Sequence, residues 1–267
     1  MKRVEMLIID PQNDFCSPDG SLFVPGADRD SERLAALLVQ ISPTIYDIHV
    51  TLDTHHRYDI AHPCFWRDKK GNNPPPFTLV SVEDVEQNVW IPVDPRKEMR
   101  TYALDYVKTL RDNNRYQLCI WPVHCLIGTK GNNVVDPIQQ ALSKWEQENT
   151  AMVNYVTKGS NFKTEHYSAL QADVPDPADP ATMLNTRLIQ TLEQAEVIVL
   201  SGQALSHCVA NTIRDIANNF GEENIQKLVL LEDTTSAVPG FEDLAESFLD
   251  EMTTRGMQTT NTKNFLI

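Results

Sequence analysis

The amino-acid sequence predicts an α/β fold in which a parallel sheet is covered by helices on both faces. Two observations support this prediction. Short apolar, β-branched runs recur along the chain, and most of them are separated by stretches with apolar residues at helical spacing. Strands that alternate with helices are joined by right-handed crossovers, which makes the strands parallel and places helices on both faces of the sheet.

The predicted strands begin close to the N-terminus, and each ends in a polar group. Their apolar, β-branched composition is typical of strands that are buried on both faces. They span residues 4–9, 45–52, 116–121, 151–156, 195–200 and 227–231.

The predicted helices lie between these strands. In residues 31–41, apolar side chains recur at Leu34, Leu37, Leu38 and Ile41, which gives a helix one apolar face. The same spacing recurs in three further segments, at residues 135–145, 208–217 and 241–252.

One segment does not follow the alternating pattern. Between about residues 66 and 114 the pattern weakens, and the Asn-Asn-Pro-Pro-Pro sequence at 72–76 is a turn signal. We therefore expect residues 1–267 to form a single domain that carries an insertion at about 66–114. This insertion is also a candidate surface for assembly into a homo-oligomer.

Charge and hydropathy restrict the partners. The formal net charge is -14, and an acidic surface repels phosphate backbones and anionic lipids. The longest apolar runs, 6–9 and 197–200, are too short to span a bilayer. We expect a small-molecule substrate and neither nucleic acid nor a membrane as a partner.

The N-terminus and the cysteines indicate a cytoplasmic protein. Residues 1–3 lead directly into the first predicted strand, without the apolar stretch and cleavage site of a signal peptide. The cysteines, at 16, 64, 119, 125 and 208, are odd in number and lack the spacing of a disulfide framework. This favours a reducing compartment and one catalytic thiol.

Chemistry is expected at the carboxyl ends of the strands, where parallel α/β sheets bind their ligands. Cys208 follows the strand 195–200 and a turn, near the predicted start of a helix. The helix dipole and free backbone N–H groups would lower the pKa of a thiol there and stabilise an oxyanion. The alternative is that Cys208 is a small buried hydrophobic residue.

Two further polar residues end strands. Asp10 follows the strand 4–9 and is a candidate general base for the cysteine proton, or else a turn aspartate. Lys158 follows the strand 151–156. It could pair with Asp10 and stabilise an anionic intermediate, or it could be a solvated surface lysine.

A cluster of histidines suggests a metal site. Asp53 and His55 are two residues apart, so in an extended segment their side chains point the same way. His124 follows another predicted strand and could supply a third ligand. The alternative is a set of polar loop histidines that bind no metal.

Taken together, these segments resemble the nicotinamidase/pyrazinamidase branch of the isochorismatase-like cysteine hydrolases. The resemblance runs from about residue 4 to the C-terminus and depends on motifs in a fixed order. They are Ile9-Asp10-Pro11-Gln12-Asn13-Asp14-Phe15, Asp53-Thr54-His55, Trp121-Pro122-Val123-His124-Cys125, Gly128-Thr129-Lys130-Gly131, Lys158-Gly159, Tyr167-Ser168-Ala169-Leu170 and Ser206-His207-Cys208-Val209.

The resemblance implies a three-layer α/β/α sandwich with a six-stranded, Rossmann-like parallel sheet. It also implies an amidase that converts nicotinamide to nicotinate and ammonia through a cysteine thioester, in NAD salvage. The implied site has a catalytic triad, an oxyanion hole with a cis peptide bond at 203–204, a metal that positions the substrate ring, and aromatic walls. The residues are Asp10, Lys158 and Cys208 for the triad, Ala204 and Cys208 for the oxyanion hole, Asp53, His55 and His124 for the metal, and Phe15, Trp121 and Tyr167 for the walls.

Three features depart from the family pattern. Leu205 replaces a usual threonine, and Asp53 and His124 are unusually far apart in the chain. Asp59 stands where the family usually has another histidine, and the sequence leaves open whether His62 replaces it. Histidine and carboxylate ligands suit zinc, iron or manganese, with zinc favoured.

Other functions are compatible with parts of the pattern. The first alternative is a metal-independent cysteine hydrolase of the same fold that acts on another amide, carbamoyl or ureido substrate. A non-catalytic binding protein and a metal hydrolase with a structural Cys208 are the others. The candidate metal ligands argue against the first alternative, and the intact triad argues against the second.

Overall fold

The computed structural model describes residues 2–265 and contains a six-stranded parallel sheet. The strand order is β10-β9-β8-β1-β2-β7, so β1 lies inside the sheet between β8 and β2. The bounds are β1 (Val4–Ile9), β2 (Ile45–Asp53), β7 (Asn154–Lys158), β8 (Val197–Gly202), β9 (Leu228–Leu231) and β10 (Gln258–Thr260). The predicted fold class is therefore confirmed.

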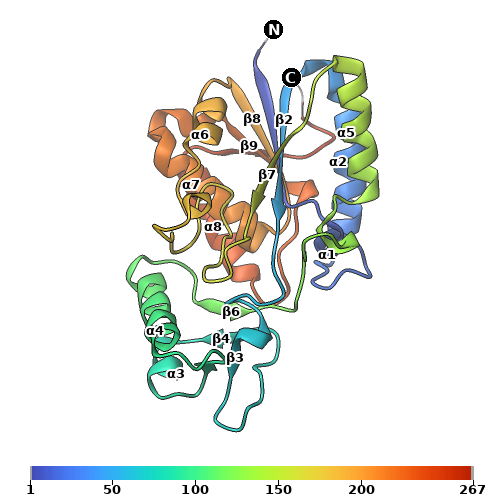
Figure 1. Cartoon of the computed structure of the whole chain (residues 1–267). Helices are drawn as coiled ribbons and strands as arrows, with labels where there is room; N and C mark the ends of the chain where they lie inside the picture. The colour runs from blue at the N-terminus through green and yellow to red at the C-terminus, as the bar shows by residue number, and fades with distance from the viewer. Residues whose placement is uncertain (1, 266–267) are drawn as a thin grey trace.

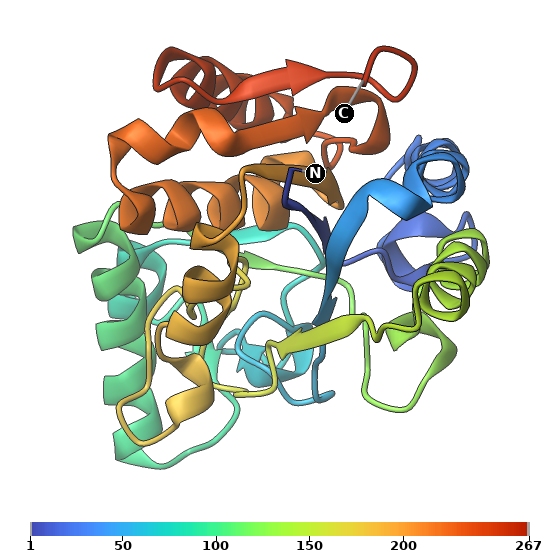
Figure 2. The same ribbon diagram turned by 90° about the horizontal axis from the view of Figure 1, so that it is seen from above.

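The inner strands are apolar because helices cover both faces of the sheet. Every residue of β1 is buried. Figures 1 and 2 show α2 (Ala27–Ile41) and α5 (Asp136–Asn149) together on one face, and α6 (Thr186–Glu193), α7 (Ala210–Phe220) and α8 (Glu242–Thr254) on the other. The apolar face predicted for 31–41 is buried in α2. Among the described residues, no helix has both the length and the apolar character needed to cross a bilayer.

One predicted strand lies outside the sheet. Residues 118–120 form β6 (Leu118–Ile120), which pairs antiparallel with β4 (Thr78–Val80). The sixth strand of the sheet is instead β10, which the sequence analysis missed because its Gln-Thr-Thr sequence has no apolar residue. Residues 118–120 are apolar because they are buried, but their strand partner is β4.

The prediction of a helix over 208–217 was also inaccurate at its start. A π-helical turn, Leu205–Val209, comes first and contains Cys208, and α7 begins at Ala210. The other helices are α1 (Asn13–Cys16), α3 (Val82–Glu86) and α4 (Lys97–Asp112). Short 3-10 turns lie at Ser42–Thr44, Pro63–Phe65, Lys130–Asn132, Pro180–Thr182, Glu222–Lys227 and Glu232–Thr234.

The segment 66–114 lies beyond the carboxyl ends of the sheet strands (Figure 1). It contains β4, α3, α4 and a small antiparallel pair, β3 (Trp66–Arg67) with β5 (Ile91–Pro92). Two tyrosines of α4 contact the loop that follows β7. The Tyr106 hydroxyl accepts the Glu165 N–H at 2.9 Å, and the Tyr102 hydroxyl donates to the Lys163 carbonyl at 2.9 Å.

Candidate active site

Asp10, Lys158 and Cys208 meet at the carboxyl end of the sheet. The Lys158 Nζ lies 2.9 Å from Asp10 Oδ2 and 3.6 Å from Cys208 Sγ. It also lies 3.1 Å from Asp53 Oδ1 and donates to the His166 carbonyl at 2.9 Å. All three residues are buried, and the structure brings these predicted residues together at one edge of the sheet.

The backbone at each strand end explains how these side chains meet. Asp10 follows β1 with a φ of 46°, and the Asp10 N–H donates to the Thr51 hydroxyl at 3.0 Å. Gly159 follows Lys158 with a φ of 84°, and a Cβ there would lie 2.6 Å from Asp53 Oδ1. Only glycine allows both that conformation and that close approach.

Burial and paired charges determine the protonation of the cluster. Burial alone would lower the pKa of Lys158, but the Asp10 and Asp53 carboxylates raise it well above its usual value. Burial raises the pKa of Asp10, and the Lys158 ammonium only partly opposes this. A carboxylate whose pKa is raised is better suited to accept a proton at neutral pH than an exposed one.

The predicted pKa of Cys208 was wrong in direction. Burial raises the pKa of the Cys208 thiol well above its usual value. The Lys158 ammonium lowers this pKa, but the Asp10 and Asp53 carboxylates raise it further. The sequence analysis considered only the helix terminus and could not include the carboxylates. The thiol is therefore neutral at rest, and its proton must be removed before it can attack.

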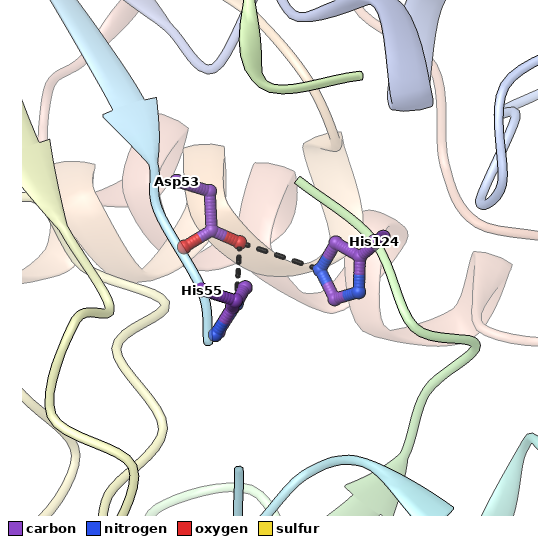
Figure 3. A group of neighbouring side chains, drawn as sticks. All are labelled: Asp53, His55 and His124. Atoms are coloured by element: carbon purple, nitrogen blue, oxygen red, sulfur yellow. Dashed lines mark hydrogen bonds and ion pairs between the residues drawn. The ribbon is translucent and has the colours of Figure 1, made fainter. Parts of the chain in front are cut away.

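Asp53, His55 and His124 form a second cluster beside the first (Figure 3). His55 Nε2 lies 3.0 Å and His124 Nε2 lies 3.4 Å from the same oxygen, Asp53 Oδ2. The backbone of His55 pairs with the segment after His124, because the His55 N–H donates to the Cys125 carbonyl at 3.1 Å. This pairing brings the two segments together although they are distant in sequence.

The donor set fits a divalent metal. The His124 Nδ1 donates to the Pro122 carbonyl at 2.8 Å, and the His55 Nδ1 lies 3.1 Å from Asp59 Oδ2. With a metal bound, each of these contacts would hold the proton on Nδ1 and leave the Nε2 lone pair free to bind the ion. One potential ligand atom from each of these three residues lies within 4.8 Å of the others.

The sequence left open whether His62 replaces the additional histidine of the family, and His62 lies next to this cluster. Its ring centroid is 5.1 Å from that of His55 and 5.4 Å from that of His124. Its Nδ1 donates to the Arg57 carbonyl at 3.3 Å, whereas its Nε2 is buried without a hydrogen-bond partner. Burial lowers the pKa of His62 to about 2, so its ring is neutral. Asp59, which stands where the family usually has that histidine, contacts the Nδ1 of His55.

A pocket opens onto both clusters. The predicted aromatic residues line it, and the Trp121 Nε1 donates to the Tyr167 hydroxyl at 3.0 Å. Ala204 and Cys208 also border the pocket, and the peptide bond between Gln203 and Ala204 is cis, as the resemblance implied. The lining residues are Phe15, Leu22, Asp53, Trp121, His124, Glu165, Tyr167, Ala204, His207, Cys208 and Val238.

Two titratable lining residues, Glu165 and His207, were not given a role by the sequence analysis. Glu165 is buried, and burial raises its pKa to about 8. His207 is surrounded by the rings of Trp121, Tyr167 and other aromatic residues, and burial lowers its pKa to about 3. In the sequence, the one indication that these two residues belong to the site is that they lie close to Tyr167 and Cys208. Their burial cannot be predicted from the sequence.

Comparisons with known proteins found similar chains by sequence and by structure. No family model matches the chain. The chain is 26% identical over 231 residues to the nicotinamidase of Saccharomyces cerevisiae, covering 86% of each chain. Among solved structures, it is similar to the Acinetobacter baumanii nicotinamidase/pyrazinamidase, with a TM-score of 0.67, 18% identity and coverage of 100% and 99%. The Pyrococcus horikoshii pyrazinamidase in complex with zinc gives a TM-score of 0.57, 17% identity and coverage of 97% and 99%. These structural matches support the fold.

Proposed function

We propose that this chain, which belongs to the nicotinamidase/pyrazinamidase branch of the isochorismatase-like cysteine hydrolases, hydrolyses nicotinamide to nicotinate and ammonia at Cys208. The observation that carries the proposal is one buried ammonium, Lys158 Nζ, 2.9 Å from Asp10 and 3.6 Å from the Cys208 sulfur. The curated relative is a nicotinamidase, and two of the three candidate metal ligands, Asp53 and His124, line the same pocket as Cys208.

In the first half of the reaction, Asp10 accepts the Cys208 proton. The thiolate adds to the amide carbon, and the electron pair of the carbonyl bond moves to the oxygen. The backbone N–H groups of Ala204 and Cys208 hold the resulting oxyanion, a type of interaction worth about 3 kcal/mol per donor. When the intermediate collapses, the C–N bond breaks and the leaving nitrogen takes the proton from Asp10, which releases ammonia and leaves a thioester.

In the second half, Asp10 removes a proton from water as the water oxygen adds to the thioester carbon. Collapse of this intermediate breaks the C–S bond, and the proton on Asp10 returns to the sulfur of Cys208. Lys158 stays protonated throughout, because two carboxylates raise its pKa. It keeps a positive charge beside each anionic intermediate.

Asp53, His55 and His124 would hold a divalent metal, for which we propose zinc, with iron or manganese as alternatives. When bound, the metal would interact with the pyridine nitrogen and so orient the ring. Phe15, Trp121 and Tyr167 would enclose the ring, since aromatic faces favour stacked or edge contacts with another aromatic ring. The carboxamide would then face Cys208.

An ammonia-release assay tests this proposal. We expect hydrolysis of nicotinamide and pyrazinamide, much slower release from carbamoyl and ureido compounds, loss of activity after dialysis against a chelator, and recovery on adding Zn²⁺. Fast turnover of a ureido acid that survives chelation would instead favour the metal-independent sister function. Absence of ammonia release from all these compounds would contradict an amidase.

Asp59 gives a more specific prediction. Its carboxylate fixes the proton of His55 on Nδ1, and partners of this kind typically change metal affinity about 10- to 100-fold. We expect Asp59→Asn to weaken Zn²⁺ binding by about that factor, measured by competition with a chromogenic chelator. As a control, Asp94→Asn changes a carboxylate that pairs with Arg96 and is not a candidate ligand, so this variant should bind Zn²⁺ as the wild type does. An unchanged affinity in Asp59→Asn would refute the assignment.

The wider setting completes the proposal. The reaction would serve NAD salvage in the cytoplasm, and all five cysteines carry free thiols, consistent with a reducing compartment. We propose that the chain is one domain and that residues 66–114 are an insertion that supports the pocket and provides a surface for self-association. Gel filtration with light scattering would measure the assembly.

A further inference from the structure

A short polar segment beside the site has no part in the chemistry above. Gln12, Asn13 and Asp14 follow the proposed general base Asp10 after one proline, and all three are buried. Neither Gln12 nor Asp14 is among the residues that line the pocket. Buried polar side chains must be hydrogen-bonded, so the position of their partners indicates what they do.

Gln12 binds the backbone of Asp53 in two directions. The Asp53 N–H donates to Gln12 Oε1 at 2.7 Å, and the Gln12 Nε2 donates to the Asp53 carbonyl at 2.7 Å. The same Nε2 donates to the Asn132 carbonyl at 2.8 Å. The Gln12 amide therefore pairs with Asp53 as a neighbouring strand would, at the point where β2 ends.

Asp14 binds the other ligand-bearing segment. Its Oδ2 accepts the N–H of Cys125 at 2.6 Å, and its Oδ1 accepts the N–H of Ser21 at 3.0 Å. Cys125 follows His124 and has a φ of 46°, a conformation that is rare outside glycine. The space around the carboxylate is small, because a Cβ at Gly131 would lie 2.1 Å from Asp14 Oδ2.

We propose that Gln12 and Asp14 are positioning residues that set the distance between the metal ligands Asp53 and His124. One segment of three residues holds the backbone of Asp53 through Gln12 and the backbone next to His124 through Asp14. The Gln12 amide makes two hydrogen bonds of opposite direction with the Asp53 backbone, and the Asp14 carboxylate makes a short, charge-assisted bond to the Cys125 N–H. This segment therefore fixes both ligands relative to each other. The inference rests on the proposed metal site, and concerns how that site is built.

Single-atom exchanges test the inference. In Asp14→Asn, the amide must turn its NH₂ toward one of two backbone N–H donors. In Gln12→Glu, an oxygen would replace the nitrogen that faces the carbonyls of Asp53 and Asn132. We expect each variant to bind Zn²⁺ about 10- to 100-fold more weakly, as is typical when the support of a metal ligand is lost.

The matched control is Asn13→Asp. Asn13 is equally buried in the same segment, but its Nδ2 donates to the carbonyls of Lys130 and Asn133, which belong to no ligand. We expect this variant to lose thermal stability like the others and to keep the wild-type Zn²⁺ affinity. Chelator competition gives the affinity, and the visible spectrum of the Co²⁺-substituted protein reports the ligand geometry independently of activity.

The outcomes separate the inference from the proposed function. If the wild type binds Zn²⁺ and both Gln12→Glu and Asp14→Asn show the same Zn²⁺ affinity and the same Co²⁺ spectrum, the inference is overturned and the proposed function is not. Equal weakening in Asn13→Asp would also overturn it, since general destabilisation would then explain the effect. A wild-type protein that binds no Zn²⁺ or Co²⁺ would overturn the metal site itself. If Asp14→Asn does not fold, Gly131→Ala displaces the same carboxylate, and the same loss of affinity is expected.

Discussion

The Cys208→Ala variant is expected to lose at least about 10⁴-fold in kcat for ammonia release from nicotinamide, because removing a covalent nucleophile removes the whole acyl-transfer route. Cys208 is not a candidate metal ligand, so Zn²⁺ affinity should remain that of the wild type. A coupled assay for ammonia and chelator competition for Zn²⁺ measure the two quantities on the same preparation.

Cys208→Ser provides a control for shape. It keeps a hydroxyl in place of the thiol, but the serine proton is far harder to remove, so we expect a similar loss of activity. Near-normal turnover in Cys208→Ala with Zn²⁺ still bound would mean that solvent is the nucleophile and that Cys208 is structural. Rapid quench followed by mass spectrometry of the wild type should detect the acyl group on the peptide that contains Cys208.

The Lys158→Met variant is expected to be strongly destabilised. Lys158 Nζ lies 2.9 Å from Asp10 and 3.1 Å from Asp53, and all three side chains are buried. Breaking a buried ion pair by removing one partner typically costs about 3–5 kcal/mol, because the other charge remains buried. Denaturant unfolding at pH 7 measures the loss, and ammonia release should fall with it.

The loss of stability in Lys158→Met should increase as the pH rises. Burial already raises the pKa of Asp10 above its ordinary value, and removal of the ammonium raises it further. The folded variant then binds more protons than the unfolded chain, so its stability falls as the pH rises above the ordinary carboxyl pKa of 3.8. The difference in the free energy of unfolding between the wild type and Lys158→Met should therefore be smallest near pH 4 and largest at neutral pH.

Lys144→Met is the matched control, since the exposed Lys144 lies 3.7 Å from Glu148. An exposed pair of this kind contributes about 1 kcal/mol or less. If Lys158→Met were no more destabilising than Lys144→Met, the buried charge cluster would not exist as described.

The sequence indicated which residues lie together at the candidate site, but it placed one supporting strand wrongly. Asp10 could be found because it follows β1, a buried strand whose apolar composition is easily recognised. Lys158 ends the edge strand β7, which is mostly exposed, so its position was less clearly marked. His124 was identified for a partly wrong reason, since β6 is not in the sheet. It reaches Asp53 because β6 pairs with β4 and the following segment pairs with His55. Antiparallel pairing across an insertion leaves no pattern in a single sequence.

Two other features could not be predicted because they depend on tertiary contacts. The pKa of Cys208 is determined by carboxylates that are distant in sequence and by burial. Glu165 looks like any loop glutamate until the fold buries it in the pocket wall. Local patterns indicate which residue types occupy strand ends, but the electrostatic environment of each residue is created by the assembled fold.

The contacts made by the insertion bear on protein engineering. A shortened enzyme without residues 66–114 would be attractive as a compact catalyst, yet it would lack the two tyrosine hydroxyls that hold the backbone at Lys163 and Glu165. That loop also provides the carbonyl of His166 that binds Lys158, and Tyr167 of the pocket wall. Trimming would further expose the edge of β6, next to Trp121. A smaller catalyst would therefore need new anchors for this loop before any residue of the insertion is deleted.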